Sequence, residues 1–144
     1  MVTIAVIDGQ GGGIGSHIVR RLREELPPEV DIVALGTNAV ATQAMMKARA
    51  NKGASGANAI KVTAPKVDAI VGALAIIAPH QMMGEVTPEI AEALLLSPAR
   101  KFLLPLRIDG ITLAGHTSVP FPHLIDKLVG ELKRCFFDSG VENV

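Results

Sequence analysis

The sequence predicts an α/β fold, a three-layer Rossmann-like sandwich built on a mostly parallel sheet with an antiparallel strand at its edge. Apolar runs alternate along the chain with segments whose apolar residues recur every four positions, as strands and helices do in such folds. The first apolar run, VTIAVI, leads directly into a glycine-rich stretch and then a helical pattern. We expect residues 1–144 to form a single domain of this kind.

The first half of the chain is expected to form two strands and two helices. The strands are predicted at 3–7 and 31–35, and the helices at about 14–26 and 39–50. The prolines at 27–28 end the first helix, because proline has no N–H to continue it. Thr37 or Asn38 is expected to cap the second helix. The glycine-bearing stretch 51–58 is predicted to be a loop. Residues 60–62 are predicted to be a short strand, whose partner strand the sequence does not indicate.

The second half is expected to complete the sheet. Its predicted elements are a strand at 67–77, a helix from 87–88 to 97–98, a strand at 101–108, a returning strand at 111–114 and a helix at about 122–136. The strand 67–77 is the most apolar run, as expected of a central strand covered on both faces. Asp109 and Gly110 predict a two-residue turn, after which the chain returns antiparallel. Pro105 places this ribbon at an edge of the sheet.

Charge and cysteine content limit the partners and the location. Fourteen basic residues balance fourteen acidic ones without a basic cluster, which argues against nucleic acid or an anionic membrane surface as a partner. The apolar run nearest to a membrane span, 67–79, is bounded by Asp68 and Pro79. Cys135 is the single cysteine and cannot form an internal disulfide. No signal-peptide pattern opens the chain, so a cytoplasmic protein is expected.

The apolar content is high and the aromatic content is low. Apolar residues make up 49% of the chain and charged residues 19%, so a folded core is expected rather than disorder. The high mean hydropathy favours burial of apolar surface between subunits, and we expect a homo-oligomer. With four Phe, no Tyr and no Trp, the chain offers little for stacking a base or a nicotinamide ring.

The stretch DGQGGGIGS, residues 8–16, carries the strongest functional signal. Exposed N–H groups at a helix N-terminus bind anions, and glycines let a phosphate approach the backbone. No Lys-Ser or Lys-Thr pair follows the glycines, which excludes a P-loop. A purely structural turn is the alternative. The predicted phosphate-binding residues are Asp8, Gly9, Gln10, Gly11, Gly12, Gly13, Ile14 and Gly15.

Asp8 stands at the strand end where a pyrophosphate would pass, and like charges would repel each other there. Its carboxylate would accept hydrogen bonds from the N–H groups of the loop itself. The other interpretation is that Asp8 holds Mg²⁺ between itself and a phosphate.

The end of the second predicted strand lacks the acidic residue that commonly holds an adenine ribose. Thr37 and Asn38 occupy that place. They would hydrogen-bond a ribose hydroxyl, or they would cap the following helix and need no ligand.

The spacing of Gly9, Gly13 and Gly15 resembles the G-x-x-x-G-I-G pattern of short-chain dehydrogenases. VDAIVGALAI resembles the fourth strand of those enzymes, and the resemblance implies that 72–75 would lie near the cofactor. Their catalytic residues include a tyrosine four positions before a lysine, and this chain has no tyrosine. Reduction by that mechanism is therefore excluded.

The motif APHQMMGEVTPE places His80 and Glu85 just beyond the predicted strand 67–77, at the sheet edge where open α/β folds bind ligands. The two side chains would serve as acid and base. The alternative is a loop leading into a capped helix, with Glu85 on the surface. Met82 and Met83 are expected to pack. No pair of histidines has the spacing of a common metal motif, so no metal ligands are assigned.

Five segments together resemble a family of short bacterial proteins known only as a domain of unknown function. They are DGQGGGIG, ALGTNAVAT, MGEVTPEIAEA, SPARKFLLPL and PFPHLIDKL. The resemblance covers nearly the whole chain and implies a Rossmann-like fold in a complete small protein. It implies no activity, so it assigns no catalytic residue.

Three functions follow as hypotheses. The first is a nucleotide-binding protein whose glycine loop holds the phosphates of NAD, NADP or another phosphorylated nucleotide, with Thr37 and Asn38 near the ribose. The second is a small enzyme that acts on a phosphorylated metabolite through His80 or Glu85. The third is a non-enzymatic oligomeric subunit or sensor in which the glycine loop is only a turn.

Overall fold

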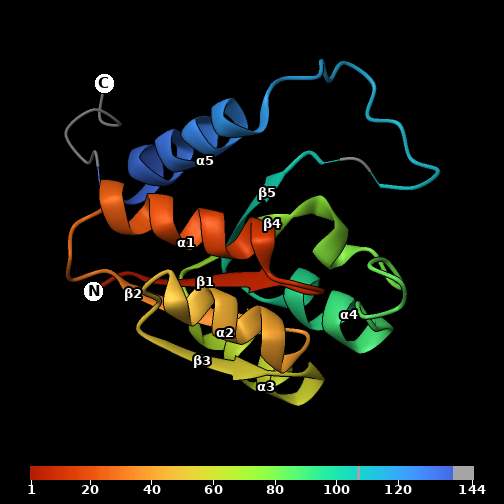
Figure 1. The fold of residues 1–144 in the computed structure, drawn as a ribbon, viewed down its shortest axis with the longest axis horizontal. Helices are drawn as coiled ribbons and strands as arrows, with labels where there is room; N and C mark the ends of the chain where they lie inside the picture. The colour runs from red at the N-terminus through yellow and green to blue at the C-terminus, as the bar shows by residue number, and fades with distance from the viewer. Residues whose placement is uncertain (107, 138–144) are drawn as a thin grey trace.

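Five parallel strands form one sheet in the structure, a computed structural model that describes residues 1–106 and 108–137 (Figure 1). The strands are β1 (Thr3–Asp8), β2 (Asp31–Gly36), β3 (Lys52–Ser55), β4 (Ala69–Ala73) and β5 (Arg100–Leu104). Their order is β3-β2-β1-β4-β5, with every pairing parallel. The chain therefore adds β2 and β3 on one side of β1, and then β4 and β5 on the other side. The strand order reverses between β1 and β4.

Helices cover both faces of the sheet, as the three-layer prediction requires (Figure 1). One face carries α1 (Gly13–Glu25), α2 (Ala39–Lys47) and α5 (Phe121–Phe136), and the other α3 (Ala57–Thr63) and α4 (Pro88–Leu96). Two 3-10 turns, η1 (Ala64–Lys66) and η2 (Leu74–Ile77), flank β4. None of the helices in the described ranges has both the length and the apolar character needed to cross a membrane.

The core divides according to the alternation of side chains along the strands. Ile4 and Val6 of β1 belong to the cluster that contains the buried faces of α1 and α5. Ala5 and Ile7 belong to the cluster beneath α3 and α4. Neighbouring residues on a strand point to opposite faces of the sheet. A strand that is covered on both faces therefore has apolar residues at consecutive positions. This confirms the doubly covered parallel sheet that the apolar runs predict.

The prediction for 51–58 as a loop and 60–62 as a strand is wrong. Lys52–Ser55 is the edge strand β3, paired parallel with β2, and Ala57–Thr63 is the helix α3. All four β3 residues are exposed, so the strand has no apolar pattern in the sequence. Its position is fixed by main-chain pairing and by the buried Thr42, whose hydroxyl lies 2.7 Å from the Ser55 hydroxyl.

The predicted antiparallel edge strand is also wrong. Strand β5 ends at Leu104, because Pro105 has no N–H to donate to a ladder. The turn at Asp109 and Gly110 is present, but among the described residues it closes only a single antiparallel bridge, between Ile108 and Ile111. The chain then runs as an exposed segment to α5 (Figure 1). Strands β3 and β5 are thus the two edges of the sheet.

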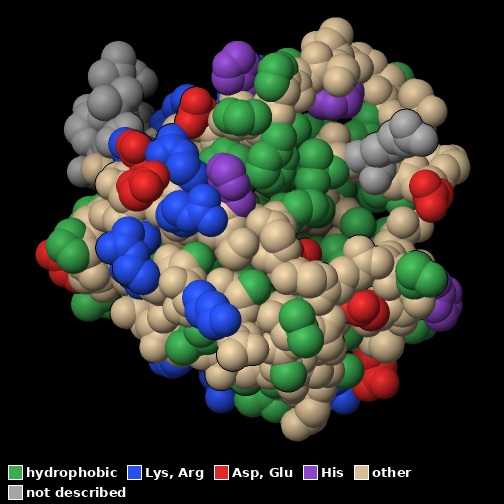
Figure 2. All heavy atoms as spheres, in the orientation of Figure 1, with side chains coloured by type: hydrophobic (Ala, Val, Ile, Leu, Met, Phe, Trp, Pro, Cys, Tyr) green, Lys and Arg blue, Asp and Glu red, His purple; other side chains and the backbone are tan. Residues whose placement is uncertain are grey.

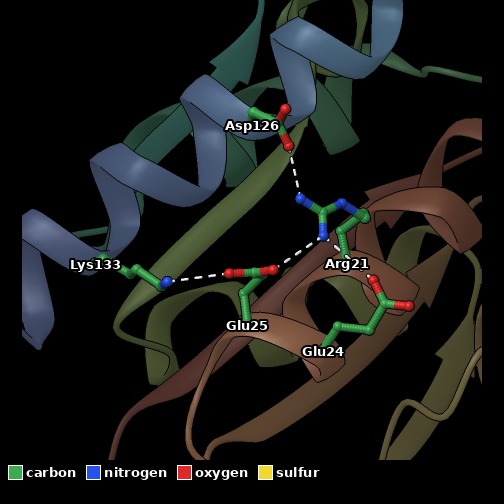
Figure 3. A network of polar contacts seen from close by, with 5 residues as sticks. All are labelled: Arg21, Glu24, Glu25, Asp126 and Lys133. Atoms are coloured by element: carbon green, nitrogen blue, oxygen red, sulfur yellow. Dashed lines mark hydrogen bonds and ion pairs between the residues drawn. The ribbon is translucent and has the colours of Figure 1, made fainter.

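Helices α1 and α5 are joined on their outer surface by a network of ion pairs (Figure 3). Arg21 of α1 pairs with Asp126 of α5 at 2.6 Å, and Glu25 of α1 pairs with Lys133 of α5 at 3.1 Å. Arg21 also lies 3.2 Å from Glu24 and from Glu25. The network therefore ties the last turns of α1 to the helix that packs beside it.

Candidate functional site at the carboxyl edge of the sheet

The residues predicted to bind a ligand meet where β1 and β2 end. Asp8 and Gly36 are paired in the sheet, so the two strands finish level with each other. The Thr37 N–H donates to the Asp8 carbonyl at 2.9 Å, which brings the residues after β2 beside the start of the glycine loop. Because the strand order reverses between β1 and β4, this edge is where an open α/β sheet leaves a crevice.

The glycine loop turns sharply between β1 and α1. The Gly12 N–H donates to the Gly9 carbonyl at 2.9 Å, closing a four-residue turn. Gln10 has a φ of 49° and Gly12 a φ of 75°, both in the left-handed region. Glycine adopts that conformation without strain, whereas glutamine does so at a cost of roughly 1–2 kcal/mol. A strained non-glycine residue in a loop is typical of functional sites.

Three glycines of the loop are required by the packing of the protein itself. A Cβ on Gly9 would lie 2.7 Å from Met82 Sδ and from Thr37 Oγ1. A Cβ on Gly12 would lie 2.8 Å from the Ala41 backbone, and one on Gly15 would lie 2.6 Å from Met45 Sδ. These glycines allow α1, α2 and the loop after β4 to close around the end of β1.

The packing of the protein does not require glycine at positions 11 and 13. A Cβ on either residue would meet no atom within 4 Å, and neither has a positive φ. The amides of Gly11, Gly13 and Ile14 donate no hydrogen bond to any residue that the structure describes. The outer side of the loop therefore presents three N–H groups at the start of a helix, with open space above two of them.

Asp8 fastens the loop from beneath. Its side chain is buried, with 4% exposed, and its two oxygens accept the N–H groups of Gly9 at 2.8 Å and Gly15 at 2.6 Å. These contacts confirm the interpretation of Asp8 as an acceptor for the N–H groups of the loop. Burial raises the pKa of the Asp8 carboxyl, the two N–H donors oppose that rise, and the charge of Glu85 adds to it.

Thr37 and Asn38 lie beside the loop, and of these two candidate caps Asn38 is the one that caps α2. The Asn38 side-chain oxygen accepts the Ala41 N–H at 2.8 Å, which satisfies the first turn of α2. Its amide nitrogen donates to the Gln10 carbonyl at 3.1 Å. A cap that uses only the oxygen of the side chain leaves the nitrogen for a second role.

That second role is to hold Glu85, which arrives from the loop between β4 and α4. Glu85 Oε1 accepts three hydrogen bonds: from the Gln10 N–H at 2.7 Å, the Thr37 hydroxyl at 2.7 Å and the Asn38 amide at 2.9 Å. The three donors lower the pKa of the Glu85 carboxyl, with the Gln10 N–H the largest cause. Glu85 is therefore an ionised acceptor at neutral pH.

The loop that carries Glu85 is held in an unusual backbone conformation. His80, Met82 and Met83 have φ values of 70°, 58° and 56°. The loop is closed by hydrogen bonds from the Glu85 N–H to the Met82 carbonyl and from the Gly84 N–H to the His80 carbonyl. Met82 packs on Gly9, as the packing interpretation of the methionines predicts, whereas Met83 is 96% exposed. His80 is exposed on this loop.

A cavity of about 610 Å³ lies further along the same edge of the sheet. Its lining includes Leu74 and Pro105, which directly follow β4 and β5. Figure 2 shows hydrophobic side chains gathered between the start of α5 and the segment after β5. Most of the lining residues are apolar, and Thr112, His116 and Ser118 contribute polar groups. Of these residues, Leu74 lies in the segment 72–75 that the resemblance to short-chain dehydrogenases places near the cofactor, whereas the spacing of the others does not predict a shared cavity.

Comparison with known proteins places the chain in a family. A search of curated proteins finds no match. A family model described as a domain of unknown function, DUF3842, matches residues 3–137, which is nearly the full sequence. The match includes β1, the glycine loop, Glu85 and α5, in agreement with the resemblance seen in the quoted segments. The chain belongs to the family of domain of unknown function DUF3842.

Proposed function

We propose that this protein binds a phosphorylated nucleotide at the carboxyl edge of its sheet, with a dinucleotide such as NAD or NADP first among the ligands. The observation that carries the proposal is the outer side of the glycine loop. Three amides there have no hydrogen-bond partner among the described residues. Two glycines face open space, and the packing of the protein does not require glycine at either position. A phosphate is the ligand chemistry that uses such N–H groups.

The surroundings of the loop agree with a nucleotide. Thr37, Asn38 and Glu85 supply polar side chains at the end of β2, on one side of the loop. The cavity next to Leu74 and Pro105 lies on the other side, past the end of β4. A ligand held by its phosphates at the loop would extend over β2 in one direction and over β4 in the other, across the point where the strand order reverses.

The two carboxylates make demands on the ligand. Asp8 already accepts two N–H groups through its two oxygens, and its charge lies beneath the place proposed for the phosphates. Bound Mg²⁺ would reduce the repulsion between Asp8 and a phosphate. The binding assays are therefore run with and without Mg²⁺.

The hypotheses of a small enzyme and of a homo-oligomer stay predictions. The low pKa of Glu85 makes it a weak general base near neutral pH.

The experiment is a thermal unfolding panel with NAD(H), NADP(H), ATP, AMP and inorganic phosphate. A ligand at about a hundred times its dissociation constant adds roughly 2.7 kcal/mol, which raises the unfolding midpoint by several degrees. The test variant is Gly13→Val. A Cβ at position 13 would meet no atom within 4 Å, so we expect the variant to fold, with its added side chain next to the unpaired amides of the loop.

Gly130→Val is the matched control. Gly130 is also a helical glycine around which a Cβ would meet nothing, but it lies on α5. We expect Gly130→Val to keep the ligand-induced shift and Gly13→Val to lose it, with at least a tenfold weaker affinity. A folded Gly13→Val variant that keeps the wild-type affinity contradicts the proposal, as does a wild-type protein that responds to no nucleotide.

A further inference from the structure

The carboxylate missing from the end of β2 in the sequence is supplied in the structure from a distant segment. Thr37 and Asn38 directly follow β2, where an acidic residue commonly holds the ribose of a bound nucleotide. Both side chains donate to Glu85 Oε1, at 2.7 Å and 2.9 Å. The carboxyl group of Glu85 therefore lies at the end of β2 although its own main chain follows β4.

The position of this carboxylate relative to the phosphate-binding amides fits a nucleotide. Glu85 Oε1 accepts the Gln10 N–H, and Gln10 adjoins Gly11, whose amide is free among the described residues. A Cβ on Gly9 would lie 2.9 Å from Glu85 Oε1, so the carboxylate rests against the first residue of the loop. A ribose hydrogen-bonded to Glu85 would thus lie next to a phosphate that is bound at the loop.

The hydrogen bonds of Glu85 are distributed unevenly over its two oxygens. All three donors converge on Oε1, and Oε2 accepts no hydrogen bond from residues 1–106 and 108–137. Glu85 is half-buried and has no ion pair with a Lys, Arg or His in these ranges. The first oxygen is therefore used to fix the side chain, and the second keeps its full capacity to accept.

We infer that Glu85 is the residue that binds the ribose, and that the ligand is a nucleotide with free 2′ and 3′ hydroxyls next to the loop. This inference rests on the proposed function. An ionised carboxylate accepts hydrogen bonds from two neighbouring hydroxyls, as it does in NAD sites. A phosphate at the 2′ position would meet the like charge of Glu85 without a cation of the described chain bonded there to offset it. Of the two dinucleotides, NAD is then the ligand and NADP is rejected.

The test measures affinities by calorimetry for two pairs of probes, NAD⁺ with NADP⁺ and ADP with 2′-deoxy-ADP. The wild type is expected to bind the first member of each pair at least about tenfold more tightly. In Glu85→Gln the charge is lost while the shape and one acceptor remain. We expect NAD⁺ affinity to fall about tenfold in this variant and the ratio of NAD⁺ to NADP⁺ affinity to approach one.

Glu89→Gln is the matched control, because Glu89 is exposed on α4 and faces Lys61 rather than the loop. It should keep both wild-type ratios. Wild-type protein that binds NAD⁺ and NADP⁺ equally overturns the inference without any variant. A Glu85→Gln protein with an unchanged ratio overturns it too. So does tighter binding of every probe by Glu85→Gln, since the carboxylate would then compete with the ligand. In these outcomes nucleotides still bind, whereas no binding of any probe by the wild type overturns the proposed function itself.

Discussion

Helix α1 is held at its two ends by polar contacts of different kinds. At the N-terminal end, the buried Asp8 accepts the Gly15 N–H at 2.6 Å and the Gly9 N–H at 2.8 Å. At the C-terminal end, Arg21 pairs with Asp126 at the same distance, 2.6 Å, but the Asp126 side chain is 59% exposed (Figure 3). Equal distances therefore join groups in very different surroundings.

The surroundings of a contact therefore decide how much it contributes to the free energy of unfolding. Asp8 is buried, so each N–H that loses this acceptor is expected to cost its desolvation penalty. Around Arg21 water solvates each charge when the pair separates, and salt screens what remains. Asp8 is thus expected to determine whether the glycine loop forms, whereas the surface network adjusts how firmly α1 and α5 stay together.

The largest effect is expected for Asp8→Ala. The substitution leaves the Gly9 and Gly15 N–H groups without an acceptor, and hydrogen bonds to a charged group contribute about 1.5–3 kcal/mol each. Removal of the buried charge offsets part of this loss. We expect a net destabilisation of about 3 kcal/mol and a fall in the unfolding midpoint of roughly 10 °C, measured by calorimetry or circular dichroism.

Asp68→Ala is the control for this prediction. Asp68 also accepts a backbone N–H, that of Thr3 at 2.8 Å, but this contact is exposed at the opposite end of β1. Its loss should cost less than about 1 kcal/mol, because water replaces the carboxylate. Equal losses of stability in the two variants would show that burial does not distinguish these contacts.

A smaller effect is expected for Arg21→Ala. Exposed ion pairs contribute about 0.2–1 kcal/mol each, and Arg21 contacts three carboxylates, so we expect a loss of about 1 kcal/mol in low salt. In 1 M salt the screening length falls to about 3 Å, and most of the difference from wild type should disappear. Arg134→Ala, which removes a single pair with Glu131 within α5, should change stability less. A loss for Arg21→Ala that is independent of salt would contradict this account.

The smallest change needs no substitution and concerns the protonation of the two site carboxyls. The pKa of Asp8 is raised by burial, so its contribution to stability is present below its unfolded pKa and is lost as pH rises through the raised native value. The pKa of Glu85 is lowered, so its contribution is present above its unfolded pKa and is lost as pH falls through the native value. Carboxyl-carbon NMR titrations should show Asp8 titrating above free Asp and Glu85 below free Glu. Shifts in the same direction would be inconsistent with this geometry.

The sequence predicts the parts of the fold that have strong apolar patterns. Strands β1 and β2 and helices α1, α4 and α5 all have such patterns, and they are present close to the predicted positions. The predicted strand 67–77 is only partly confirmed, because β4 ends at Ala73 and Leu74–Ile77 form the 3-10 turn η2. The strand Lys52–Ser55 has none, because a short edge strand is stabilised by main-chain pairing and buries no side chain. The prediction for the chain after Leu104 is wrong for the opposite reason, because there the sequence does contain a structural signal. Its turn residues predict a hairpin, but Pro105 prevents the ladder of hydrogen bonds that a hairpin needs.

The site was predictable only as far as its residues are close in sequence or follow a rule for strand ends. Gly9 to Gly15 are contiguous, and Thr37 and Asn38 follow β2, so both groups were placed at one edge. Glu85 was expected at the same edge because it follows β4. Its three hydrogen bonds were not foreseen, because they depend on a loop with left-handed residues at His80, Met82 and Met83 that no turn signal in the sequence specifies.

The strand order also determines when the site is complete during synthesis of the chain. Glu85 is 48 residues beyond Thr37, its partner in the site. At translation rates of about 5–20 residues per second, Glu85 is added roughly 2–10 s after Thr37. A nascent chain that has already paired β1 with β2 carries its glycine loop through that interval without the carboxylate that holds Gln10. Under the proposed function, a nucleotide would meet the amides of the loop before it meets Glu85, and selection by the ribose would begin only when β4 and the loop after it have been made.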